Sequence, residues 1–165
     1  MLLEAGVIAH SRGSDQRHRL ASGRRLARLI SMSEIVEFVH HNAARVSPKI
    51  LQGIHAKLPQ LKLEFAEIHA PKYPHLVDQL EFLADVVEDY AENADADIPY
   101  FTLAEACFAL AYAHKQLHLI PDNVPEVGYA DESSVVRTVL IENEKVLSEY
   151  AKRHGLDWGE ITTQA

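Results

Sequence analysis

The sequence predicts an all-α fold: a single compact bundle of about five or six helices, with a proline- and glycine-rich elbow between the last two long ones. Apolar residues recur at helical spacing along most of the chain, and no run alternates apolar and polar residues as a half-buried strand would. A chain of 165 residues with 47% hydrophobic and 24% charged residues is long enough to bury its own core. It contains no internal repeat, low-complexity tract or second folded domain.

Residues 1–31 are expected to form a basic, flexible arm that ends in a short helix. Six arginines stand against Glu4 and Asp15, so this segment has a net charge of +4. Glycine and serine interrupt it, and its apolar pattern begins only at Leu26. The helical domain is therefore expected over residues 32–165, which carry −12 because the whole chain carries −8. Such a surface repels phosphate backbones, so we expect no binding to nucleic acid.

Capping signals mark the first helices of this domain. Ser31 and Glu34 have the spacing of a capping box, which predicts that a helix begins beside them. Ser47 and Pro48 supply the cap and the first turn of a short second helix that ends near Lys57. A further helical pattern begins at Leu58 and continues until Ala70 and Pro71 stop it. The apolar positions expected on the buried faces of these helices are Ile35, Phe38, Val39, Val46, Leu58, Leu61, Phe65 and Ile68.

The clearest amphipathic helix is predicted from His75 to Asn93. Thr102 and Glu105 then have the spacing of a second capping box, which predicts the start of the next helix. That helix is apolar on nearly every side, so we expect it to be the central and most enclosed one. The buried face of the His75–Asn93 helix is expected to consist of Leu76, Leu80, Leu83, Val87 and Tyr90.

One long helix is predicted to close the domain. Asp131 or Ser133 can cap its start, and Gly155 is placed to end it behind a basic last turn. Asn143 lies within its apolar stripe, where a polar side chain either bonds within the monomer or pairs across a homodimer interface. The stripe itself consists of Val136, Val139, Leu140, Val146, Leu147 and Tyr150.

The segment L-I-P-D-N-V-P-E-V-G-Y-A-D-E separates these last two helices. Its prolines exclude helical backbone before them, and its glycine permits a positive φ or a close backbone approach. We therefore interpret the segment as a rigid elbow whose acids accept hydrogen bonds from backbone amides. The residues that define the elbow are Leu119, Ile120, Pro121, Asp122, Pro125, Gly128, Tyr129, Asp131 and Glu132.

Residues 104–136 resemble the YkvA-like family, also called domain of unknown function 1232, whose hallmark is an alanine-rich helix that runs into such a turn. This chain departs from the family pattern at His118, where an acid is usual, and at the polar Asn123 and Glu126. The resemblance implies a helical fold and a shared turn, and it supplies no activity or cofactor. The residues that carry it are Ala109, Leu110, Tyr112, Leu119, Ile120, Pro121, Asp122, Val124, Pro125, Gly128, Tyr129, Asp131 and Glu132.

A metal site is one hypothesis for the elbow. His114 and His118 are four residues apart, so both imidazoles lie on one helical face and can chelate a transition metal. Asp122, Asp131 and Glu132 could complete a mixed site for zinc, iron or manganese. The alternative is a pair of histidines at an exposed helix end, in which case the sequence predicts no cofactor.

An interaction surface is the second hypothesis. The helix from His75 to Asn93 carries an acidic stripe and no lysine or arginine to balance it. It is either a solvated face or the contact surface for a basic partner, for which the chain's own arm is one candidate. The residues of this acidic stripe are Asp78, Glu81, Asp85, Glu88 and Glu92.

These observations favour a non-enzymatic module for protein interaction or regulation. The chain has no nucleophile elbow, phosphate-binding glycine loop or paired C-x-x-C, and Cys107 lies in an apolar helix as a core residue would. The alternative function is metal binding or metal-dependent catalysis at the elbow. A single cysteine, no membrane-spanning run and no basic secretion signal favour a cytoplasmic location. We expect a protein partner or self-association, with peripheral membrane contact only through the basic arm.

Overall fold

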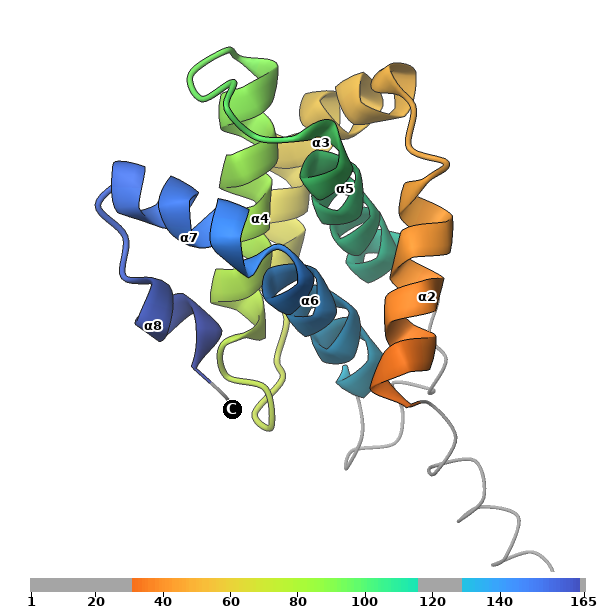
Figure 1. Cartoon of the computed structure of the whole chain (residues 1–165). Helices are drawn as coiled ribbons and strands as arrows, with labels where there is room; N and C mark the ends of the chain where they lie inside the picture. Colours follow the sequence, from red (N-terminus) through yellow and green to blue (C-terminus); the bar gives the residue numbers. More distant parts are fainter. Residues whose placement is uncertain (1–30, 116–128, 164–165) are drawn as a thin grey trace, which may run out of the picture. The chain divides into compact units, whose positions relative to one another are not determined.

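The fold is all-α, as predicted. The computed structural model describes residues 31–115 and 129–163, which contain seven helices and no strand, more helices than the predicted five or six (Figure 1). The described helices do not include one with the length and apolarity needed to cross a membrane. They are α2 (Met32–Ala43), α3 (Pro48–Ala66), α4 (Leu76–Ala91), α5 (Tyr100–Lys115), α6 (Ala130–Glu142), α7 (Glu144–Arg153) and α8 (Trp158–Thr162).

Helix α2 begins at Met32, directly after the predicted capping residue Ser31. Val39 is fully buried in the core, and Phe38 packs edge-on against two aromatic rings of α5. Its ring centroid lies 5.6 Å from that of Phe108 and 5.8 Å from that of Tyr112. The predicted buried face of this first helix is therefore confirmed.

Helix α3 corrects the predicted division into a short helix and a separate pattern. Ser47 caps it as expected, because its Oγ accepts a hydrogen bond from the Ile50 amide at 3.3 Å. The helix then continues through Pro59 to Ala66. A proline inside a helix removes one backbone hydrogen bond. The helix persists because Leu58 and Phe65, on either side of the proline, are both buried in the core.

Helix α5 occupies the predicted central position, in contact with α2, α3, α4 and α6. However, it begins at Tyr100, two residues before the expected capping box. Thr102 and Glu105 are buried inside the domain and bond to Asn143 of a distant segment. The spacing of a capping box is therefore real, but the interpretation of these two residues as a cap is wrong.

The predicted last helix is divided into two, α6 and α7, at Asn143. The expected stripe is nonetheless confirmed, since its residues are buried or partly buried on both sides of the break. The predicted stop is also confirmed, because α7 ends before Gly155, which has a φ of +69°. Helix α8 was not predicted; Asp157 caps it by accepting from the Gly159 amide at 2.8 Å.

Buried charge holds the end of α7 against the loop between α4 and α5. Asp95 in that loop lies 2.8 Å from both Nε and Nη2 of Arg153, and 3.3 Å from Nε2 of His154. Although burial opposes the change, the hydrogen bonds from Arg153 and from the Asp97 amide lower the pKa of Asp95. A second link joins α7 to α4 itself, because the Tyr150 hydroxyl donates to Asp89 at 2.6 Å.

Candidate functional site

The predicted metal ligands lie only partly within the described residues. His114 near the end of α5 contacts Glu64 of α3, with 2.9 Å between Nδ1 and Oε2. Asp131 at the start of α6 is buried and accepts a hydrogen bond from the Tyr112 hydroxyl at 3.0 Å. Residues 31–115 and 129–163 contain no group of three or more His, Cys, Asp or Glu side chains that could hold a metal ion. His118 and Asp122 lie outside these ranges, so the five-residue site stays a hypothesis.

The elbow is described only at its end. Its residues from Leu119 to Gly128 lie outside the described part of the chain. Tyr129 has a positive φ of 65° and directly precedes α6. Asp131 and Glu132 follow in the first turn of that helix, and both are buried.

The acidic stripe of α4 is partly neutralised by α3, which the sequence of α4 alone did not reveal. Lys62 of α3 places Nζ 2.8 Å from Oδ1 of Asp85 and 2.6 Å from Oε2 of Glu88. Burial is the largest single effect on the pKa of Lys62 and lowers it. The hydrogen bonds and charges of Asp85 and Glu88 together outweigh burial, so the pKa is raised. Asp78 and Glu81, nearer the start of the helix, are exposed.

An exposed apolar strip borders this stripe on α3. The strip consists of Pro59, Leu63 and Ala66, which are neighbours on one helical surface because they are three or four residues apart. Leu63 at its centre is 73% exposed. Lys62 precedes Leu63 and reaches across to the acids of α4, so the strip and the stripe adjoin. We call the two together the α3–α4 face.

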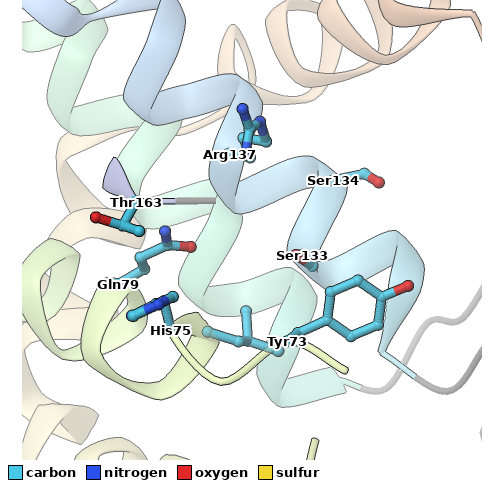
Figure 2. Close-up of a pocket in the computed structure, with 8 residues that line it drawn as sticks. Tyr73, His75, Gln79, Ser133, Ser134, Arg137 and Thr163 are labelled. Atoms are coloured by element: carbon cyan, nitrogen blue, oxygen red, sulfur yellow. The ribbon is translucent and has the colours of Figure 1, made fainter. Parts of the chain in front are cut away.

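A cavity of about 190 Å³ opens between the start of α4, the first turns of α6 and the end of α8. Figure 2 shows Gln79 and Thr163 together on one side of it, and Arg137 with two serines of α6 on the other. Gln79 links two of its walls, because its side-chain Nε2 donates to the carbonyl oxygen of Ile161 at 2.9 Å. The cavity is lined by Tyr73, His75, Leu76, Gln79, Ser133, Ser134, Arg137 and Thr163.

Sequence reasoning missed this cavity, and Arg137 is its one unusual residue along the chain. Arg137 is the only basic residue between Ala130 and Glu142, and it lies four residues after Ser133 on the same helical face. Arg137 is only partly exposed.

A fully buried carboxylate lies at the break between α6 and α7. Glu105 of α5 accepts a hydrogen bond from the Asn143 side chain, and its other oxygen lies 3.1 Å from Nε2 of His40. Asn143 also accepts from the Thr102 hydroxyl at 2.8 Å. Burial raises the pKa of Glu105, while the Asn143 hydrogen bond and His40 oppose that rise. Asn143 thus bonds within the monomer, the first of the two alternatives predicted for it.

Cys107 is a core residue, as predicted. Its side chain is fully buried in the middle of α5. Burial raises the pKa of the thiol to about 12, so the reactive thiolate is not populated near neutral pH. The described structure therefore gives this cysteine no role as a nucleophile.

No protein-family model, curated protein or solved structure matches this chain. The resemblance of residues 104–136 to the YkvA-like family accordingly stays a prediction.

Proposed function

We propose that this protein is a non-enzymatic helical module that docks a partner protein on the α3–α4 face. The observation that carries the proposal is the exposure of Leu63, which is 73% accessible on a helix whose opposite face packs into the core through Leu58 and Phe65. Full burial of a leucine contributes about 1.5–3 kcal/mol. Binding of a partner that covers Leu63, Pro59 and Ala66 is favoured by this burial, which is absent while the strip faces water.

Charge determines the kind of partner. The acidic stripe contributes five carboxylates to this face, and Lys62 offsets part of their charge. Asp78 and Glu81 remain exposed at the end of the stripe nearest the start of α4. Apolar side chains beside uncompensated acids favour a basic amphipathic segment, whose aliphatic face meets Leu63 and whose lysines meet the acids.

A binding titration with a synthetic peptide tests this proposal. The probe is a helical peptide with one leucine-rich face and one lysine-rich face, and binding is followed by chemical-shift changes of labelled protein. We expect the changes to map onto α3 and α4. Leu63→Ser should weaken binding by about tenfold, because the apolar anchor is lost. Glu81→Lys should weaken peptide binding more at low salt than at high salt, because the contribution of Glu81 is electrostatic.

The matched control is Leu156→Ser, which removes a leucine that is 44% exposed beyond α7 and away from this face. This variant should bind the peptide as the wild type does. Equal weakening by Leu63→Ser and Leu156→Ser, or equal binding of a peptide with glutamates in place of lysines, would refute the proposal. Self-association that Leu63→Ser abolishes would identify a second copy as the occupant in place of a basic partner.

Family membership and location form part of the same proposal. Relatedness to the YkvA-like family is supported by the residues around the elbow and implies no activity. A cytoplasmic location fits a single buried cysteine. The remaining partner in the proposal is an anionic lipid surface, which the basic arm of residues 1–31 would contact peripherally.

Metal binding at the elbow is the second candidate function. It is favoured by the position of Asp131 and Glu132, which are both buried in the first turn of α6, because carboxylate oxygens and imidazoles are ligands for such ions. Elemental analysis of protein purified without a histidine tag tests it. Stoichiometric metal that is lost in His114→Ala and Asp131→Ala would support a site, and metal-free protein after growth with zinc, iron and manganese would exclude it.

A further inference from the structure

The cavity between α4, α6 and α8 presents positive charge and hydrogen-bond donors to a ligand. Its lining of described residues contains Arg137, His75, Gln79 and hydroxyl groups, but no aspartate or glutamate. This is unusual in a region where acidic residues outnumber basic ones by 22 to 10 over residues 32–165. The cavity is therefore a local positive feature on an acidic domain.

Arg137 is not used for an ion pair in the described part of the chain. Arg153 shows what the fold does with a structural arginine, because it bonds to Asp95 through two nitrogens. The guanidinium of Arg137 instead lines a cavity. An arginine with a free planar fork at a cavity is suited to bidentate binding of an oxyanion.

The other polar groups divide into those that build the walls and those that remain for a ligand. The hydroxyls of Ser134 and Thr163 donate to the carbonyl oxygens of Ala130 and Gly159, at 2.7 and 2.6 Å. Ser133 has no such hydrogen bond among the described side chains and lies one turn before Arg137. Ser133, Arg137 and His75 therefore remain as hydrogen-bond donors for a ligand.

Helix α4 adds a favourable field. His75 occupies its N-cap position without making a side-chain capping bond, and the helix begins at the cavity. The first amide groups of a helix carry partial positive charge. His75 at the N-cap of α4 and the Ser133–Arg137 pair on α6 thus line the cavity from two helices, an arrangement suited to the several acceptor oxygens of a tetrahedral anion.

The size of the cavity limits the ligand. A water molecule occupies about 30 Å³ in the liquid, so the cavity holds the volume of about six waters. Sites for drug-sized ligands and cofactors span about 300–1,000 Å³, which exceeds it. We propose that this cavity binds a phosphate group, either as inorganic phosphate or as the phosphoryl end of a small molecule, held by Arg137, Ser133 and His75.

Calorimetric titration of the full chain with inorganic phosphate tests the proposal, with ionic strength held constant by sodium chloride. We expect saturable binding in the millimolar range or tighter. Arg137→Gln should weaken it at least tenfold, because hydrogen bonds to charged groups are the strong ones. Ser133→Ala should weaken it by a smaller factor. Lys145→Gln, which removes one positive charge from an exposed position on α7, is the matched control and should leave the affinity unchanged.

Further ligands separate the sources of the phosphate group. Tighter binding of glycerol phosphate than of inorganic phosphate identifies the phosphoryl end of a larger molecule as the ligand, and the reverse order identifies the free ion. Acetate bound as tightly as phosphate would overturn the assignment. Equal losses in Arg137→Gln and Lys145→Gln, or no saturable binding at all, would overturn the site. Unchanged thermal unfolding of Arg137→Gln without ligand verifies that this variant is folded, and Arg137→Lys replaces it if it is not.

Discussion

Replacing Asn143 with leucine should destabilise the domain, because this side chain satisfies two buried groups of α5. Asn143 is 7% exposed, and its side chain bonds to Thr102 and to Glu105, which are 3% and 0% exposed. It also donates to the carbonyl oxygen of Val139, which accepts a backbone hydrogen bond from Asn143 as well. The substitution therefore leaves one hydroxyl and one carboxylate buried without this partner, while the Val139 carbonyl retains a bond.

The magnitude follows from these burials. A buried polar group that loses its hydrogen bond costs about 1–3 kcal/mol, and a charged group lies at or above the upper end of that range. The two groups together then cost about 4–6 kcal/mol. Leucine at a mostly buried position contributes about 1.5–2 kcal/mol in the opposite direction. We therefore expect the free energy of unfolding to fall by about 2–4.5 kcal/mol in Asn143→Leu.

Urea denaturation of a double-mutant cycle with Thr102→Val measures this contribution. In the wild-type background, Thr102→Val should destabilise, since it removes the donor to Asn143. In the Asn143→Leu background, the same change should be neutral or stabilising, because the hydroxyl has already lost its acceptor. Additive effects with no coupling between the two sites would refute the reasoning. Sedimentation should show the same oligomeric state for wild type and Asn143→Leu, since Asn143 bonds within the monomer.

Two further outcomes follow from the structure. Burial raises the pKa of Glu105 above its ordinary value of 4.5, so its contribution to stability is fully present below pH 4.5 and is lost as pH rises through the folded-state pKa. The unfolding free energy of wild type relative to Glu105→Gln should therefore fall with rising pH, measured by urea denaturation from pH 4 upward, and a pH-independent difference would contradict this. Gly155→Ala should cost about 1–2 kcal/mol, because φ is +69° there and no atom lies within 4 Å of the added Cβ, so backbone strain alone acts. Thermal unfolding measures it, with Gly53→Ala at an exposed position within α3 as a control that should be neutral or stabilising.

Local rules predicted the features that depend on neighbours in sequence. The cap at Ser47, the buried face of α4 and the stop at Gly155 follow from spacing, hydroxyl chemistry and backbone geometry within a few residues. The all-α class follows from the same periodicity. These features required no knowledge of how the helices pack.

Tertiary contacts decided the features that the sequence did not predict. Thr102 and Glu105 match a capping box, yet they bond to Asn143, which lies about 40 residues further along the chain. The break between α6 and α7 occurs at that same Asn143, inside an otherwise continuous apolar stripe. Spacing within one helix cannot distinguish a residue that caps its own helix from one that bonds to another.

The candidate sites show the same limit. The acidic stripe was readable from α4 alone, but its balancing Lys62 comes from α3. The cavity brings together residues near positions 75, 135 and 163, which contribute three, three and one polar side chains. No single segment carries a motif for it, so the packing of three helices had to be known before Arg137 could be distinguished from an ordinary surface arginine.

The two proposed sites share helix α4, and their charges link them. His75 and Gln79 line the cavity, while Asp78 between them begins the acidic stripe. A phosphate group in the cavity adds negative charge close to that end of the stripe, so it favours a basic partner on the α3–α4 face. Linkage requires that the partner favour phosphate by the same factor. Because a Debye length of about 8 Å screens exposed charges at physiological salt, the coupling must be modest and must weaken as salt is added. Its sign, however, is fixed by the charges alone.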